Sequence, residues 1–195
     1  RLIELGPEAM ALLEKALATA TREKNDEVTH RLQDALDILR AMSLDDSGRL
    51  RQWAAQAKAS SEYSDEDWSA MQATGPPNTK AAGDARTAWA TRDADGGEEW
   101  IELTYTQWVH PPHVRIHETF NPGAVVKIEA LDSVDRWIVL WQGRDSTTEA
   151  PAWLTLGLGS SKIKTRTIRI TIDTSAVNGW NEIDAEVFEA NIAAT

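Results

Sequence analysis

Apolar and polar residues alternate one by one along several short stretches after residue 99. Residues 100–105 place Ile101, Leu103 and Tyr105 on one side, and residues 167–172 repeat this pattern with isoleucines. Successive side chains of a β-strand point to opposite faces, so this period predicts strands buried on one side. The pattern covers residues 100–105, 113–117, 126–130, 167–172 and 181–187, and residues 137–141 are apolar throughout, as in a strand covered on both faces. Six such strands predict a mainly β fold, a β-sandwich.

The beginning of the chain has a different period. Apolar residues recur every three or four positions at residues 10–17 and again at residues 28–42, which predicts two amphipathic helices. The connection between them is short and polar, so the two helices are expected to pack as an antiparallel hairpin. Turn residues follow at 43–48. We therefore expect a helical hairpin over residues 1–48 and a β-sandwich over residues 49–195.

Composition limits the possible partners. The 195 residues carry a net charge of −11 and include no cysteine. An acidic surface repels phosphate backbones, so we expect no nucleic-acid partner. No apolar run approaches the length of a spanning helix, so we expect no membrane insertion. The first residue is Arg1 rather than Met, and we expect the chain to be part of a larger, bacterial protein whose compartment stays open.

A series of short motifs resembles the discoidin-like domains of the galactose-binding-like (coagulation factor 5/8 type C-like) jelly rolls. The matching segments are 59–64, 68–70, 72–78, 88–90, 99–103, 117–125 and 179–185. They are similar to uncharacterised bacterial domains and to the discoidin-like part of certain F-box leucine-rich-repeat proteins. The resemblance implies a jelly-roll β-sandwich that binds sugars, lipid headgroups, collagen or proteins through loops at one end. Separately, residues 5–17 resemble one unit of a HEAT-type repeat.

Tryptophan is unusually frequent, with nine residues in the chain. An indole ring can stack on a sugar while its N–H donates a hydrogen bond. Trp68 and Trp89 flank the long loop 69–87 and are candidate ligand-binding residues, together with Asn78 and Asn121 in segments covered by the resemblance. The tryptophans within or beside strands are expected in the core: Trp100, Trp137, Trp141 and Trp180.

Acidic residues enter the same long loop. Asp65 and Asp67 lie at its start, and a second acidic run covers residues 93–99. Calcium binds carboxylate and carbonyl oxygens, which irregular loops supply, and the resemblance implies a structural calcium near the first long loop. Asp65 and Asp67 are therefore candidate calcium ligands. The alternative is that these carboxylates are solvated loop charges.

The sequence contains no arrangement typical of an enzyme. Glu118 and Asp184 are the carboxylates considered for acid–base chemistry, and both lie in segments that match the fold itself, where they would tie loops to strands. No nucleophile–base set or phosphate-binding loop accompanies them. We therefore expect a non-catalytic recognition module with carbohydrate as the favoured ligand. A protein-interaction or scaffolding module is the alternative, because the apolar stripes of the hairpin need a partner.

Overall fold

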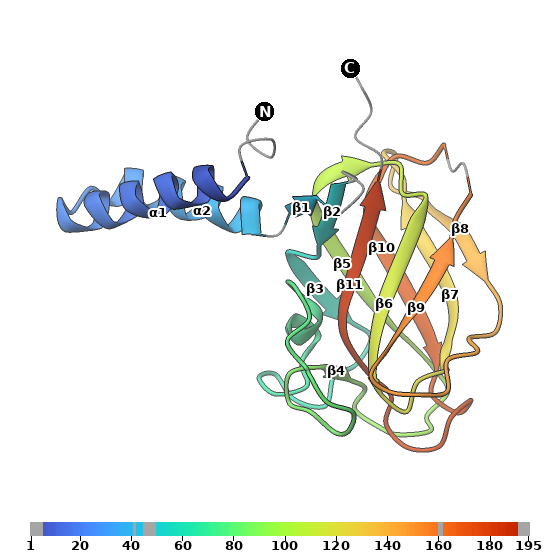
Figure 1. Cartoon of the computed structure of the whole chain (residues 1–195). Helices are drawn as coiled ribbons and strands as arrows, with labels where there is room; N and C mark the ends of the chain where they lie inside the picture. Colours follow the sequence, from blue (N-terminus) through green and yellow to red (C-terminus); the bar gives the residue numbers. More distant parts are fainter. Residues whose placement is uncertain (1–5, 41, 45–49, 160–161, 191–195) are drawn as a thin grey trace.

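The structure, a computed structural model, describes residues 6–40, 42–44, 50–159 and 162–190. Helices α1 (Gly6–Arg22) and α2 (Asp26–Arg40) form the predicted hairpin, which projects sideways from the β-sandwich (Figure 1). Asn25 caps α2, because its Oδ1 accepts a hydrogen bond from the Val28 amide at 3.2 Å. The helix ends at Arg40, so Met42, which the apolar period placed on it, lies in a strand instead.

Two antiparallel sheets make up the sandwich. One sheet has the order β1 (Met42–Leu44), β2 (Leu50–Trp53), β11 (Glu182–Ala190), β6 (His113–Phe120) and β9 (Ala152–Gly157), with β4 (Trp89–Ala90) also paired to β11. The other has the order β3 (Gln56–Ala59), β5 (Glu98–Val109), β10 (Thr165–Asp173), β7 (Val125–Leu131) and β8 (Trp137–Gln142). Successive strands from β5 to β11 pass between the sheets except at the β7–β8 hairpin. The predicted jelly-roll sandwich is confirmed.

The core lies between the two sheets, and the alternating residues fill it. Ile101 and Leu103 of β5 face the isoleucines of β10, and all are buried. Ile116 of β6 and Ile128 of β7 complete the layer from the two sheets. The period-2 prediction is therefore confirmed for these strands, because the residues on one face of each strand are the ones removed from water.

Two strands differ from the predicted pattern. The pairing of β11 with β6 shifts register between Ile183 and Ala185. This bulge at Asp184 leaves Ile183 in the core and turns Ala185 and Val187 to the other face, where they pack with Trp53 and Trp153. Strand β8, expected to be covered on both faces, lies at the edge of its sheet, has no buried residue, and leaves Val139 51% exposed.

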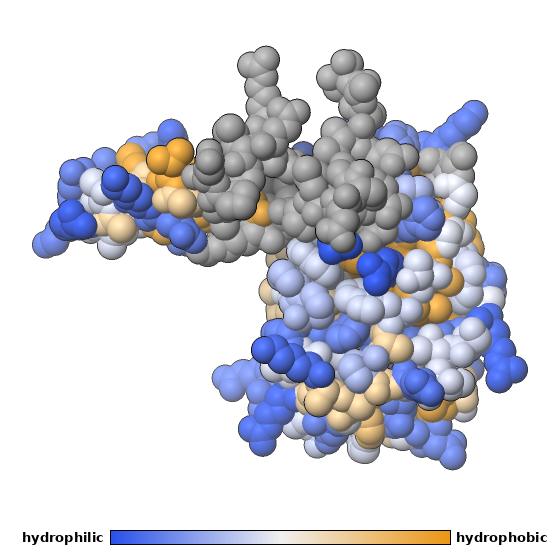
Figure 2. Space-filling model, in the orientation of Figure 1, coloured by the Kyte–Doolittle hydropathy of each residue, from blue (hydrophilic) through white to orange (hydrophobic). Residues whose placement is uncertain are grey.

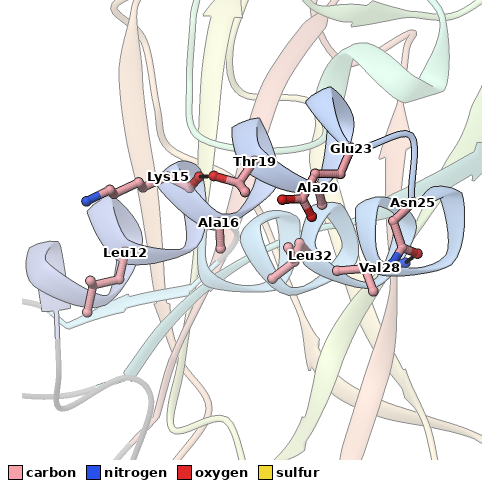
Figure 3. A pocket seen from close by; sticks show the side chains of 9 residues that line it. All are labelled: Leu12, Lys15, Ala16, Thr19, Ala20, Glu23, Asn25, Val28 and Leu32. Atoms are coloured by element: carbon pink, nitrogen blue, oxygen red, sulfur yellow. Dashed lines mark hydrogen bonds between the residues drawn. The ribbon is translucent and has the colours of Figure 1, made fainter.

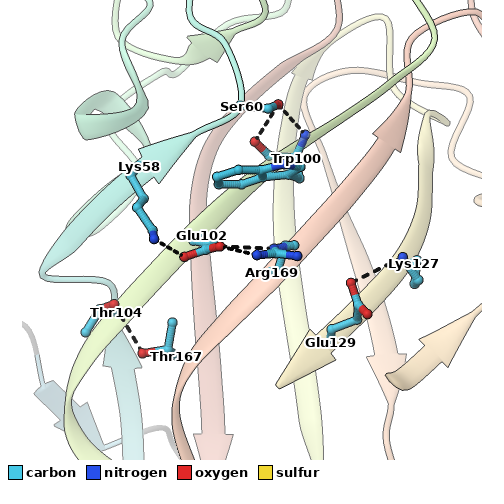
Figure 4. A network of polar contacts seen from close by, with 9 residues as sticks. All are labelled: Lys58, Ser60, Trp100, Glu102, Thr104, Lys127, Glu129, Thr167 and Arg169. Carbon is cyan, nitrogen blue, oxygen red and sulfur yellow. Dashed lines mark hydrogen bonds and ion pairs between the residues drawn. The ribbon is translucent and has the colours of Figure 1, made fainter. Parts of the chain in front are cut away.

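The outer face of the β3–β8 sheet carries a network of paired charges (Figure 4). Glu102 is buried and accepts hydrogen bonds from the Arg169 guanidinium, whose Nε lies 3.1 Å from Glu102 Oε1. It also forms an ion pair with Lys58, whose Nζ lies 2.7 Å from Oε2. The Arg169 guanidinium lies 4.8 Å from the Trp100 ring centroid and 4.1 Å from that of Trp137. Because these charges are paired with one another, we interpret the network as stabilising the packing of neighbouring strands and not as a ligand-binding site.

The strand β1 joins the helical part of the chain to the sandwich. It pairs with β2 from Met42 opposite Gln52 to Leu44 opposite Leu50. The division into residues 1–48 and 49–195 stays a prediction, although the sheet already begins at β1. In the part of the chain that the structure describes, no helix has both the length and the apolarity needed to cross a membrane.

Candidate functional site

Five connections gather at one end of the sandwich, the lower end in Figure 1. They follow β3, β4, β6, β8 and β10, because these strands end there in the antiparallel arrangement. The longest connection, residues 60–88, contains one turn of 3-10 helix, η2 (Ala70–Ala73). The helical hairpin joins the sandwich near the opposite end.

Two carboxylates of β11 hold the backbone of the long loop. Asp184 accepts hydrogen bonds from the amides of Asn78 and Thr79, both at 3.1 Å to Oδ2. Glu182 accepts one from the amide of Ala85 at 3.1 Å. Residues two apart on an alternating strand share a face, and both side chains reach the same loop although the register of β11 against β6 shifts at Asp184. The loop is thus fixed through backbone groups to a strand that is distant in sequence.

Three aromatic side chains meet beside this loop, and we call Tyr63, Trp68 and Trp180 the aromatic cluster. The Tyr63 ring lies edge-on to both indoles, with centroids 5.3 Å from Trp68 and 5.9 Å from Trp180. Tyr63 is 53% exposed and Trp180 39% exposed. The Trp180 indole N–H donates to the Thr91 carbonyl at 3.1 Å, which fixes the ring while leaving part of it accessible to a ligand.

Backbone and amide contacts hold Trp180 in place. The Asn121 side chain donates to the Trp180 carbonyl at 2.9 Å. The amide of Gly179 donates to Asp95 Oδ1 at 2.9 Å, and Gly179 has a φ of 89°, which a side chain would strain. Residues of the loops after β4 and β6 therefore hold both the backbone and the indole of Trp180, which itself lies in the loop after β10.

The charges nearest to the aromatic cluster are partly paired. The Arg86 guanidinium lies 5.7 Å from the Trp68 ring centroid and 3.6 Å from an Asp67 carboxylate oxygen. The Trp68 indole N–H donates to Glu182 at 3.2 Å. Glu182 therefore holds the Trp68 indole by its N–H, and Arg86 lies over its ring. Trp68 is less exposed than Tyr63.

The structure separates the four predicted ligand residues. Trp68 belongs to the aromatic cluster, and Asn121 supports it through Trp180. Asn78 is exposed, and its backbone amide binds Asp184, away from these rings. Trp89 is 0% exposed, and its indole N–H donates to the Ser61 carbonyl at 3.0 Å. The prediction for Trp89 is wrong in this structure, because a side chain without accessible surface cannot contact a ligand.

Sequence reasoning missed two members of the cluster. Trp180 was expected in the core because it adjoins a strand, but it precedes β11 in a turn that contains Gly179 and is partly exposed. Tyr63 received no role. The glycine two positions before Asn181 was the available signal for a turn at Trp180, whereas the loop position of Tyr63 alone did not distinguish it.

The predicted calcium ligands do not converge. Asp65 is exposed, and Asp67 is paired with Arg86, whose positive charge disfavours a second cation. Within the described ranges, no group of three histidine, aspartate or glutamate side chains is arranged to hold a metal ion. Since calcium ligands include carbonyl oxygens, the calcium prediction itself stays untested.

Buried carboxyl groups lie at the same end of the sandwich. Burial raises the pKa of Glu118 to about 8, with a further rise from Asp145. Burial also raises the pKa of Glu182 to about 8, and the neighbouring Asp84 adds to it. Glu118 accepts from the Gly123 amide at 3.0 Å, which confirms, together with the contacts of Asp184, that these carboxyls tie loops to strands.

The helical hairpin presents a separate apolar groove. Figure 2 shows apolar side chains at the surface of the hairpin, and Leu12 is 69% exposed. A groove of about 390 Å³ between the helices is lined by residues of both, including Ala16 of α1 and Leu32 of α2 (Figure 3). The hairpin buries little of its own apolar stripe, as expected of two helices alone.

The fold is a jelly-roll β-sandwich, similar to galactose-binding-like, discoidin-like modules. Several solved structures with this fold are carbohydrate-binding modules. A pectin-binding module is 20% identical with a TM-score of 0.51, over 72% of this chain and 93% of that one. The family 32 module of NanJ from C. perfringens, in complex with galactose, is 18% identical with a TM-score of 0.52, over 71% and 98%. At these identities the likeness establishes the fold.

The chain belongs to the family described as Pappalysin-1, SD scarf domain, C-terminal, which matches residues 43–191. The helical hairpin lies outside the matched residues. Among curated proteins, F-box/LRR-repeat protein 4 of Bos taurus is 29% identical over 101 residues. This stretch is 46% of the present chain and only 16% of the bovine protein.

Proposed function

We propose that the chain is a non-catalytic module that binds carbohydrate at the aromatic cluster. The observation that carries this proposal is the pair of partly exposed rings, Tyr63 and Trp180, with centroids 5.9 Å apart. Hydrogen bonds from the loops after β4 and β6 hold Trp180 in position, and the Tyr63 ring packs against it. Rings that are fixed before binding lose little conformational freedom when a sugar stacks on them. The carbohydrate-binding modules that share the fold support the same ligand class. A bacterial parent protein stays a prediction.

The test is a glycan array with the full chain in calcium-containing buffer, followed by titration calorimetry with the best ligand. We expect Tyr63→Ala and Trp180→Ala each to weaken binding about tenfold, because a lost stacking contact is worth about 1 kcal/mol. Trp108→Ala is the matched control, since Trp108 is equally exposed but lies on β5 near the other end. Binding that survives both cluster variants, or no glycan bound by the unaltered chain, would overturn the proposal.

A structural calcium near the long loop stays part of the proposal, as the resemblance implies, with Asp65, Asp67 and carbonyl oxygens of the loop as its ligands. Within the described residues, no three histidine, aspartate or glutamate side chains gather to hold a metal ion. We expect calcium to raise the melting temperature by several degrees relative to EDTA, and the double variant D65N/D67N to reduce this rise. An equal melting temperature with and without calcium would contradict it.

A protein-interaction module is the second candidate, and the exposed groove of the helical hairpin favours it. Apolar surface of this kind commonly marks a contact with another protein. The glycan array separates the two candidates, because a chain that binds a defined protein and no glycan supports this alternative instead.

A further inference from the structure

The loops around the aromatic cluster carry a strong excess of negative charge. Between residues 62 and 99 the chain has nine aspartates and glutamates against three lysines and arginines. Asp65, Glu66, Asp93 and Asp95 are exposed in these loops. Asp95 also accepts a hydrogen bond from the amide that precedes Trp180. Because exposed charges within a Debye length of about 10 Å act together, a ligand on the rings lies in a negative potential.

The basic residues of the same loops leave this excess in place. Arg86 lies over Trp68, but its guanidinium is 3.6 Å from the Asp67 carboxylate, so the two charges largely compensate each other. Lys80 follows the stretch whose backbone binds Asp184. Arg92 is exposed beside Thr91, whose carbonyl holds the Trp180 indole. Apart from the Arg86–Asp67 pair, exposed Lys80 and Arg92 therefore stand against six exposed carboxylates in residues 62–99: Asp65, Glu66, Asp84, Asp93, Asp95 and Glu98.

The geometry points to glycans with free amino groups as the ligand class of this site, an inference that rests on the proposed carbohydrate function. A protonated amino sugar is attracted by the exposed carboxylates. Its ammonium group also interacts favourably with the face of an exposed aromatic ring such as Tyr63 or Trp180. A uronic acid chain carries a carboxylate on each sugar and is repelled by the same field. A neutral, N-acetylated sugar can stack on the rings but gains nothing from the carboxylates.

The experiment compares three oligosaccharides of equal length against the full chain by titration calorimetry, at about pH 5.5 and low salt. The probes are a glucosamine hexamer, its N-acetylated form and a galacturonate hexamer. We expect the glucosamine hexamer to bind at least about tenfold more tightly than the N-acetylated form, and the galacturonate hexamer not to bind. The preference should disappear in about 0.5 M sodium chloride, because salt screens exposed charges.

Charge variants identify the source of the preference. The double variant D65N/E66Q removes two exposed carboxylates that make no side-chain hydrogen bond or ion pair within the described part of the chain. We expect it to weaken glucosamine binding about threefold. The matched control E23Q/D34N removes the same charge from the helical hairpin and should leave this affinity unchanged. A neutral or acidic hexamer that binds as tightly as glucosamine overturns the inference but leaves the carbohydrate function standing. If none of the three hexamers and no array glycan binds, both fail.

Discussion

Replacing Trp89 with alanine is expected to lower the free energy of unfolding by about 3–5 kcal/mol, the usual cost of removing a large aromatic residue from a core. Among the residues whose burial the structure describes, Trp89 is the largest fully buried side chain, and it packs between the two sheets. The substitution also leaves the Ser61 carbonyl without its donor, the indole N–H at 3.0 Å. Chemical denaturation followed by tryptophan fluorescence measures the change.

Trp108→Ala is the control for Trp89→Ala. Trp108 is partly exposed, and its ring centroid lies 5.5 Å from the Arg166 guanidinium. Losing this contact should cost only about 1 kcal/mol. A Trp89→Ala protein that is as stable as the control but no longer binds glycan would restore the original prediction of Trp89 as a ligand residue.

The stability of the sandwich is expected to fall as the pH rises from about 5 to about 8. The pKa of Glu118 and that of Glu182 are both raised to about 8 by burial, whereas an unfolded glutamate ionises near pH 4.5. The folded chain therefore binds more protons than the unfolded chain within this window, and raising the pH favours unfolding. The stabilising effect is complete below about pH 4.5 and lost above about pH 8.

Glu118→Gln tests this pH dependence directly. Glu118 Oε2 and Asp145 Oδ2 are buried without a donor among the described residues, which fits a proton held between the two carboxyls. Glutamine is neutral at every pH and can donate from its amide to Asp145, so the variant should be more stable than the unaltered chain at pH 8, by about 3 kcal/mol. At pH 5 the two proteins should be nearly equal.

Thermal unfolding in EDTA at both pH values makes the comparison, because EDTA removes any effect of calcium on the carboxyls. Glu149→Gln is the control, since Glu149 is exposed on the loop after β8 and its removal should change stability equally at pH 5 and pH 8. If Glu118→Gln shows the same pH dependence as this control, a shared proton at Glu118 is excluded.

The strand period predicted the sandwich because burial on one face repeats with the pleat. The inward residues Ile101, Leu103, Ile168 and Ile170 were all assigned correctly on this basis. The short strands were not predicted: β3 has four residues and β4 has two, and neither is long enough to show a period. Their pairing is decided by β5 and β11, which lie elsewhere in the sequence.

The candidate site was only partly predictable, because tertiary contacts determine which aromatic residues reach the surface. Trp89 lies in the two-residue strand β4 and Trp180 in the turn before β11, and the first is buried while the second is partly exposed. Trp89 is buried because β4 pairs with β11 opposite Ile183 and directs this ring into the core between the sheets. No periodic signal in the sequence marks this pairing. The resemblance to discoidin-like domains directed attention to the loops at one end of the sandwich, and their role in binding stays a prediction.

The way in which β11 holds the long loop has a consequence for protein engineering. The groups bound by Asp184 and Glu182 are the backbone amides of Asn78, Thr79 and Ala85. A backbone amide is present in every residue except proline, so the side chain at an exposed position such as Asn78 can be exchanged without removing these bonds. A combinatorial library with proline excluded could therefore vary the exposed positions of this loop on a constant backbone, and new binding specificities could be selected from it.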